Sequence, residues 1–155
     1  MLNVIFLYEN PFAMKRNIFF LLLIILTGIN ARSQSVTINI NGIRNYDGQL
    51  QIAVFENQQQ FHDEEPVEKL NFAKSDISNG RKSIKINLKS GTYAITVLDD
   101  GDKSDDMTYR LGLYPKEGVG FSNYTLKGLK KPDFSDFDFA IDQNNKQVNV
   151  DIKYF

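Results

Sequence analysis

The 155-residue chain contains no cysteine. This absence excludes disulfides, thiolate metal sites and a lipid-modified N-terminal cysteine. The only histidine is His62, which argues against a zinc site of ordinary nitrogen and sulfur ligation. A lone histidine in a polar stretch is expected to lie on the surface. Stability must therefore come from packing and strand pairing, or from a bound ion.

The chain also lacks a basic excess and the common catalytic motifs. Lysine and arginine number 18 against 19 acidic residues, a formal charge of −1, which argues against a general nucleic-acid binder. Ser122 follows Gly118 and Gly120 but has no G-x-S-x-G nucleophile elbow. Nothing supports a Ser-His-Asp triad around His62, and no glycine loop could cradle a phosphate. We therefore predict that the protein is not an enzyme.

Long apolar runs are missing except near the start of the chain. Met14-Lys15-Arg16 precedes the apolar run 18–26, as in a secretory signal, and this run is shorter than the roughly 20 residues of a membrane span. We expect residues 1–33 to be a signal-peptide region whose true start is Met14. Residues 34–155 would then form a single domain without a transmembrane span. This domain would be exported to the periplasm or the exterior of a bacterium.

Apolar and polar residues alternate with a period of two along about seven short segments. Such segments have one dry and one wet face, as in antiparallel sheets that are covered on one side. The pattern predicts an all-β fold, an antiparallel immunoglobulin-like β-sandwich of about seven strands. The expected strands are 36–40, 50–54, 70–73, 84–88, 93–97, 137–141 and 148–154.

Turn-forming pairs separate these segments. Asp47-Gly48, Asn79-Gly80, Ser90-Gly91 and Asn144-Asn145 stand between successive strands. Such pairs supply the positive φ that tight hairpins need. We therefore expect Asp47-Gly48 and Asn144-Asn145 to join the first and the last strand pair. The polar stretch 57–68 predicts a loop with one helical turn.

An acidic loop, residues 99–106, follows the central strand. Asp100, Asp102 and Ser104 alternate as do the oxygen ligands at positions 1, 3 and 5 of a calcium loop. Position six lacks the usual glycine, and Leu111 stands where position twelve requires a glutamate. Two further readings are a solvated acidic turn and a hydrolase that uses paired carboxylates. The candidate calcium ligands are Asp99, Asp100, Asp102, Asp105, Asp106 and Glu117.

An aromatic-rich stretch follows the acidic loop. Tyr109, Tyr114, Phe121 and Tyr124 are candidates for lining a groove that binds a sugar or a peptide. The alternative is that Phe121 plugs one end of the sandwich, where neighbouring glycines let the backbone pass closely.

Several strings in this order resemble an exported bacterial family known as domain of unknown function 2141. They are Gly91-Thr92-Tyr93-Ala94-Ile95, the acidic loop, Pro115-Lys116-Glu117-Gly118-Val119-Gly120-Phe121-Ser122-Asn123 and Lys131-Pro132-Asp133-Phe134-Ser135-Asp136. The resemblance implies an immunoglobulin-like or prealbumin-like sandwich and export, and no activity. Family members tend to read His-Asp-x-Asn-x-Asn-Gly-x-x-Asp where this chain has its acidic loop, with the histidine and the glycine replaced.

The function most consistent with these features is a non-catalytic binding or structural module of the cell envelope. Its partner would be another envelope protein or a glycan. The alternatives are a calcium-stabilised adhesion or carbohydrate-binding domain, and the hydrolase that acts through the acidic loop.

Overall fold

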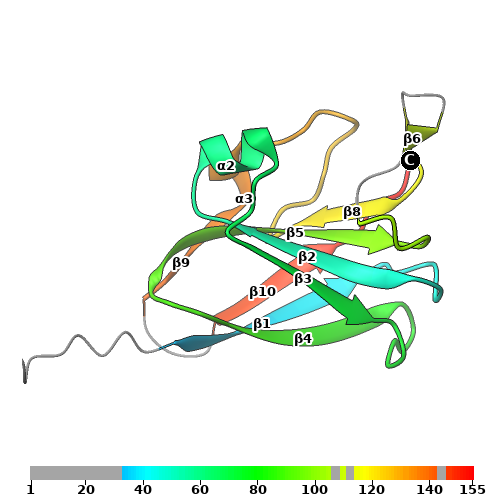
Figure 1. The fold of residues 1–155 in the computed structure, drawn as a ribbon, viewed down its shortest axis with the longest axis horizontal. Coiled ribbons are helices and arrows are strands. Elements are labelled where there is room, and N and C mark those ends of the chain that lie inside the picture. Colours follow the sequence, from blue (N-terminus) through cyan, green and yellow to red (C-terminus); the bar gives the residue numbers. More distant parts are fainter. Residues whose placement is uncertain (1–32, 106–108, 111–113, 143–145) are drawn as a thin grey trace, which may run out of the picture. The chain divides into compact units, whose positions relative to one another are not determined.

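The computed structural model describes residues 33–105, 109–110, 114–142 and 146–155 (Figure 1). The chain divides into two units, residues 1–31 and 32–155, and the described residues belong to the second. The predicted start at Met14 and almost all of the predicted signal region lie outside the described residues. No helix in the described part of the chain is long and apolar enough to cross a membrane.

Eight strands form two sheets. A three-stranded sheet has the order β10-β1-β4, and a five-stranded sheet has the order β3-β2-β5-β8, with β9 pairing beside another part of β5. A separate pair of two-residue strands, β6 (Tyr109–Arg110) and β7 (Tyr114–Pro115), follows the acidic loop. The eight strands are β1 (Gln34–Asn41), β2 (Gln49–Phe55), β3 (Glu68–Ala73), β4 (Arg81–Leu88), β5 (Gly91–Asp100), β8 (Gly118–Phe121), β9 (Asp138–Ile141) and β10 (Lys146–Asp151).

The prediction of a mainly antiparallel all-β fold is confirmed, with two corrections. The first and last strands of the sheets, β1 and β10, pair in parallel, with Val36 opposite Lys146. The strand β8 was not predicted, because glycines at positions 118 and 120 interrupt its apolar pattern. The two sheets therefore hold eight strands rather than seven.

The two sheets face each other across one apolar core. Alternate residues of strands from both sheets point into it and are nearly inaccessible to solvent. Burying such a side chain fully contributes about 1.5–3 kcal/mol, so this layer is the main source of stability. Fully buried members are Val36, Ile38, Leu50, Ile52, Val54, Ile95, Val97, Val148 and Val150.

The predicted turn pairs join strands that belong to different sheets, although Asn79-Gly80 does form a tight two-residue turn in which Ser78 and Arg81 exchange backbone hydrogen bonds. β1 and β2 lie in different sheets, as do β3 and β4, β4 and β5, and β9 and β10. Asn79 and Gly80 do turn the chain with positive φ angles of 51° and 69°. Gly48 also has a positive φ, of 81°, whereas Asn144-Asn145 lies outside the described residues.

Two short helices cover the outer face of the five-stranded sheet (Figure 1). The expected helical turn is α2 (Gln58–Asp63), where the Asn57 side chain accepts a hydrogen bond from the Gln60 amide. The second helix is α3 (Phe134–Phe137). It includes Phe137, which was predicted to be the first residue of a strand. The rings of Phe61 and Phe137 meet edge to face at 4.9 Å, so the helices also hold each other.

The strand β8 is closely apposed to the C-terminal segment. Val119 exchanges backbone hydrogen bonds with Lys153, and Ser122 bridges to Val150. Gly118 and Gly120 face this segment without a side chain. A Cβ atom at Gly120 would lie 2.5 Å from Cγ1 of Val150 and 3.0 Å from the Asp151 carbonyl oxygen. These glycines are therefore required by close approach.

We expect Gly120→Ala to lower the free energy of unfolding by about 1–3 kcal/mol, because the added methyl overpacks this contact. Chemical denaturation measures the loss. Gly128→Asn is the matched control, since a Cβ at Gly128 meets nothing within 4 Å and asparagine tolerates the φ of +80° there. An equal loss in both variants would contradict the packing explanation.

Candidate functional site

The two outer faces of the sheets differ in chemistry. The outer face of the three-stranded sheet carries polar side chains such as Thr37, Asn39 and Ser83. The outer face of the five-stranded sheet is apolar, and its residues form a second buried cluster with the covering helices. The members of this cluster are Ala53, Phe55, Phe61, Ala94, Val119, Phe121, Leu126 and Phe137. The site is built on this apolar outer face.

A pocket of about 400 Å³ opens over that face. Its apolar lining includes Leu98, Val119 and Phe121 of the sheet, and Leu126 from the segment that follows β8. Leu129 and Phe155 also line it, with 56% and 40% of their surface exposed. Two large apolar side chains of the pocket are thus exposed to solvent.

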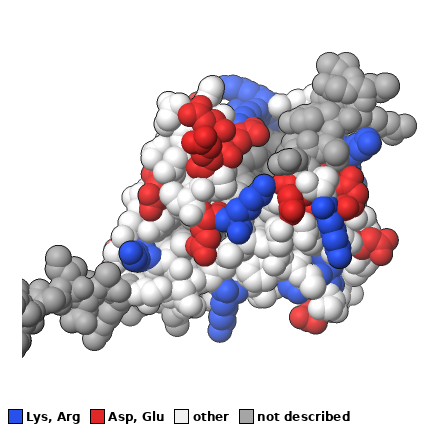
Figure 2. Space-filling model, in the orientation of Figure 1, with Lys and Arg blue, Asp and Glu red and all other residues white. Residues whose placement is uncertain are grey.

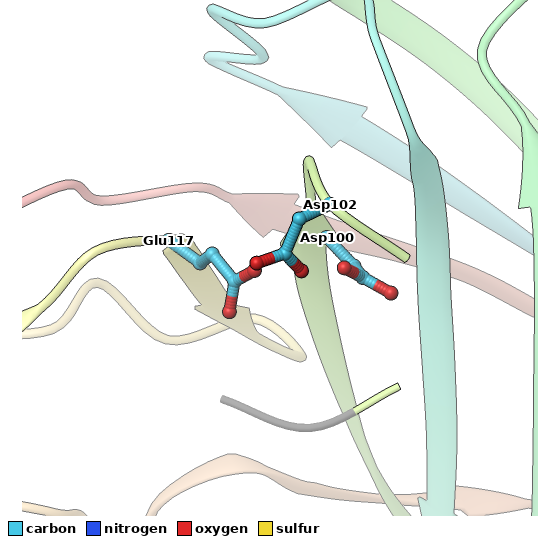
Figure 3. Close-up of side chains that lie close together, drawn as sticks. All are labelled: Asp100, Asp102 and Glu117. Carbon is cyan, nitrogen blue, oxygen red and sulfur yellow. The ribbon is translucent and has the colours of Figure 1, made fainter. Parts of the chain in front are cut away.

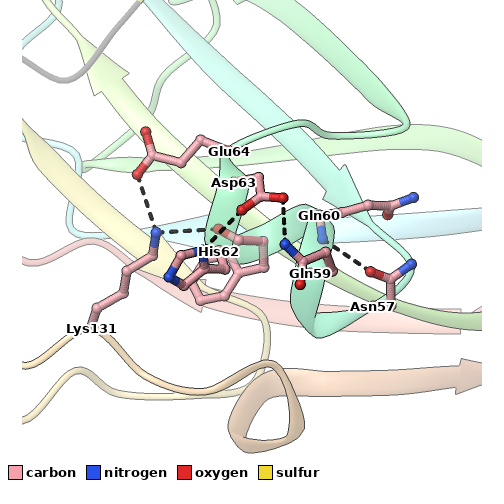
Figure 4. Close-up of polar contacts among 8 residues, drawn as sticks. Asn57, Gln59, Gln60, His62, Asp63, Glu64 and Lys131 are labelled. Atoms are coloured by element: carbon pink, nitrogen blue, oxygen red, sulfur yellow. Dashed lines mark hydrogen bonds and ion pairs between the residues drawn. The ribbon is translucent and has the colours of Figure 1, made fainter.

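Charged side chains surround this pocket. Its lining includes three lysines, Lys69, Lys130 and Lys131, and two acidic residues, Glu64 and Asp105. Lys131 contacts Glu64 at 3.1 Å and lies over the Phe61 ring, as Figure 4 shows beside α2. Figure 2 shows a hollow in the surface beside the cluster of acidic side chains at α2. Basic side chains border this hollow. The pocket therefore has a largely apolar lining in which lysines outnumber acidic residues by one.

The acidic loop folds around the carboxylate of Asp100. This side chain is fully buried and accepts hydrogen bonds from the backbone amides of Ser104 and Asp105, each at 3.1 Å, and from Gln49 at 2.8 Å. Burial would raise the pKa of the Asp100 carboxyl, but these hydrogen bonds outweigh it and hold the pKa below the ordinary 3.8. Asp100 is therefore an ionised anchor of the loop.

Asp105 makes the turn for which the sequence has no glycine. It occupies position six of the loop counted from Asp100 and has a left-handed φ of 62°. Its Oδ1 atom accepts hydrogen bonds from Gln49 at 2.8 Å and Asn71 at 2.7 Å, and its carbonyl accepts one from Lys69. Side chains of the sheet hold this strained residue in place. Asp105 therefore adopts the left-handed conformation that a glycine would otherwise supply at this position.

Three of the predicted calcium ligands converge. Each of Asp100, Asp102 and Glu117 has a carboxylate oxygen, and these atoms all lie within 4.8 Å of one another (Figure 3). Asp100 and Glu117 are buried, whereas Asp102 is exposed. Asp105 lies on the sheet face instead, and Asp106 lies outside the described residues.

Asp99 points away from this group, into the space between the sheets. It shares its strand face with Ile95 and Val97, and it contacts Lys74 and Tyr154, which the sequence did not single out. The period-two alternation along β5 was the available signal, because it puts Asp99 and Asp100 on opposite faces. Asp99 is therefore not a ligand of the same cation as Asp100.

The predicted aromatic residues divide between packing and the pocket. Phe121 is 6% exposed, meets Phe61 and Phe137 edge to face, and still contributes to the pocket lining. Tyr124 packs edge to face against Phe121 at 6.4 Å. The side chains of Tyr109 and Tyr114 lie outside the described part of the structure. Phe121 therefore packs under the helices on the outer face of the five-stranded sheet rather than at one end of the sandwich, and it also lines the pocket.

His62 lies on the surface of α2, with 78% of its side chain exposed. Its Nδ1 atom is 2.9 Å from the neighbouring Asp63 carboxylate (Figure 4). Hydrogen bonds from His62 and Gln59 lower the pKa of Asp63. His62 does not line the pocket.

A family model described as "Uncharacterized protein conserved in bacteria (DUF2141)" matches residues 38–149. The match extends from β1 into β10 and includes the acidic loop. No curated protein and no solved structure matches the chain.

We expect Asp100→Asn to lower the free energy of unfolding at pH 7 by about 1–3 kcal/mol, because the amide is a poorer acceptor than the carboxylate for the loop amides. The pKa of Asp100 is lowered on folding, so its contribution is complete above pH 3.8 and is lost as the pH falls through the folded-state pKa. The difference between wild type and variant should therefore shrink in acid. Denaturation at several pH values measures it.

The exposed Asp138→Asn is the control and should change stability little at any pH. A difference between wild type and Asp100→Asn that stays constant down to strongly acidic pH would show that the charge of Asp100 is not what anchors the loop.

Proposed function

Because this chain belongs to the uncharacterised bacterial family DUF2141, its function has to come from its own surface, and we propose that it is a non-catalytic binding module of the cell envelope. The observation that carries the proposal is the pocket of about 400 Å³ over the five-stranded sheet. This volume is in the range of small-molecule sites, which are mostly apolar with a few polar anchors.

The lining indicates the kind of ligand. Leu98, Val119, Phe121 and Leu126 would contact an apolar group, and the exposed Leu129 and Phe155 would be covered by it. A glycan, the other ligand considered from the sequence, suits this apolar lining less well. The ligand is a small molecule with an apolar body, and the basic excess of the lining favours an anionic head group.

A catalytic role has less support. A general acid needs a raised pKa at its working pH, whereas hydrogen bonds lower the pKa of Asp100. Asp99 is sealed between the sheets, away from the pocket. The hydrolase alternative would therefore have to use other carboxylates of the acidic loop.

The finer fold assignment and the location are part of this proposal. Two facing, mainly antiparallel sheets suit an immunoglobulin-like or prealbumin-like sandwich, with the parallel β1–β10 pair as a variation. The basic and apolar residues near Met14 suit a secretory signal. We place the mature domain in the periplasm or outside the cell.

We expect an anilinonaphthalene sulfonate dye to bind the wild-type protein and fluoresce, and Thr96→Phe to reduce this binding at least tenfold. Thr96 is half-buried and lines the pocket, so the larger ring would occupy ligand space. Thr37→Phe makes the same substitution on the polar outer face of the other sheet and should bind the dye like the wild type. Fluorescence titration measures all three.

Competition separates the two parts of the proposal. Octanoate should displace the dye at lower concentration than octylamine, since the lining carries more lysine than acid. If octylamine competes better, the anionic head group is wrong. If the dye does not bind, or binds both variants equally, the pocket is not a binding site.

Calcium binding is the second candidate function, favoured by the turn at Asp105 and by Glu117, which approaches from outside the loop. Asp100, Asp102 and Glu117 are hard oxygen ligands of the kind that calcium prefers. A bound ion would connect the acidic loop to β8 through Glu117, which directly precedes that strand. It would therefore stiffen one end of the site.

We expect millimolar calcium to raise the melting temperature, corresponding to about 1–3 kcal/mol when the ion is in large excess over its dissociation constant. The double variant Asp102→Ala, Glu117→Ala should lose this response. Asp76→Ala removes an exposed carboxylate from another loop and should keep it. Differential scanning calorimetry with calcium and with a chelator decides, and equal melting temperatures for the wild type would exclude the calcium site.

A further inference from the structure

The side chains of a lysine, an aspartate and a tyrosine meet between the sheets, apart from the pocket. Lys74 directly follows β3, Asp99 lies near the end of β5, and Tyr154 is the penultimate residue of the chain. The side chains of Lys74 and Asp99 are only 1% and 0% exposed. No role in ligand binding accounts for them.

The contacts in this group are specific. The Lys74 ammonium lies against Oδ1 of Asp99 and donates a hydrogen bond to the Asp47 carbonyl at 2.6 Å. The Tyr154 hydroxyl donates to Oδ2 of Asp99 and accepts from the Arg44 amide at 3.0 Å. The nitrogen of Lys74 thus lies beside the carboxyl group of Asp99, whose other oxygen is held by a phenol.

One atom of the group has no hydrogen bond. Oδ1 of Asp99 is buried and lacks a hydrogen-bond partner among the described residues, although the Lys74 amine is next to it. A buried ion pair is favourable only when its geometry is good and its remaining polar atoms are satisfied. As an ion pair, this contact keeps two charges buried between the sheets, where their desolvation is costly.

We propose that Lys74 and Asp99 condense to an intramolecular isopeptide bond. A proton first passes from the Lys74 ammonium to Oδ1 of Asp99, and the lone pair this frees on Nζ then attacks Cγ, so that a C–N bond forms. The C–Oδ1 bond breaks, and Oδ1 leaves as water with two protons that the ammonium group supplies. One hydrogen remains on the nitrogen, both charges disappear, and no oxidant or other reactant is needed.

The amide product would satisfy each polar atom that the ion pair leaves in conflict. Its N–H would donate to the Asp47 carbonyl, the partner of the amine now. Its carbonyl oxygen, the former Oδ2, would accept from Tyr154. The atom that leaves, Oδ1, is the one without a hydrogen bond. The surroundings therefore fit an amide better than separate charges.

Tyr154 is placed to assist the reaction. Negative charge develops on Oδ2 as nitrogen attacks Cγ, and a fixed donor to that atom stabilises the transition state. Burial first, and then the hydrogen bond to Asp99, raise the pKa of Tyr154, so the hydroxyl keeps its proton at neutral pH. Gly118 makes room for this ring, because a Cβ there would lie 2.6 Å from Cε1 of Tyr154.

The position of the bond gives it a structural purpose. It would tie the end of β3, an edge strand, to the central strand β5, with β2 between them. The two residues stand 25 positions apart, so the bond would close a loop in the unfolded chain as a disulfide does. A chain without cysteine would in this way gain a covalent cross-link.

The intact mass of the purified wild-type protein tests the proposal directly. We expect a mass one water molecule below that of the linear sequence, unchanged in strong denaturant. Trypsin should fail to cut after Lys74 and should release a branched peptide that joins residues 70–81 to residues 90–103. A full linear mass together with cleavage after Lys74 would overturn the proposal, whatever the variants do.

Variants then assign the roles. Lys74→Arg and Asp99→Ala should show the full linear mass, and Lys85→Arg, which changes an exposed lysine of β4, should keep the water loss. Asp99→Asn should form the same amide with loss of ammonia and so reach the wild-type mass. Tyr154→Phe should slow bond formation at least tenfold, as followed by intact mass at intervals after a short pulse of protein synthesis. A Tyr154→Phe variant that reacts at the wild-type rate would remove Tyr154 from the mechanism.

Discussion

The structure depends on the burial of β5 on both of its faces. This central strand pairs with β2 on one side and with β8 and β9 on the other, and its side chains alternate between two apolar layers. Ile95 and Val97 face the other sheet, whereas Ala94 faces the covering helices. Both layers and the pocket meet at this strand, and where its apolar run ends, Asp99 and Asp100 continue the alternation into two separate polar environments.

Sequence reasoning could find the strands but not their partners. The alternation of apolar and polar residues around Val36, Ile38 and Ile40 is a local property of the sequence. The structure has the same alternation as buried and half-buried side chains along β1. Which sheet a strand joins depends on contacts between residues distant in sequence. The prediction that Asp47-Gly48 joins two paired strands is wrong for this reason, because β1 and β2 lie in different sheets. The strand β8 escaped notice because its glycines are needed for close approach and break the apolar pattern.

The candidate site was predictable to a similar extent. Alternating spacing pointed to Asp100 and Asp102, and Glu117 was one of four further acidic candidates; the structure brings these three together. The sequence could not show that a left-handed Asp105 makes the turn, since side chains of the distant strands β2 and β3 hold it there. The pocket could not be predicted from the sequence either, because its lining residues come from segments that are far apart in the chain and meet only in the fold.

The parallel pairing of β1 with β10 has a consequence for how the chain acquires its structure. Among the described strands the first, β1, has the last, β10, as its neighbour, so the three-stranded sheet is incomplete until residues 146–151 are available. Such pairing between the two ends of a sequence gives a high contact order, which slows folding. A chain that still lacks β10 therefore leaves one side of β1 without its partner strand.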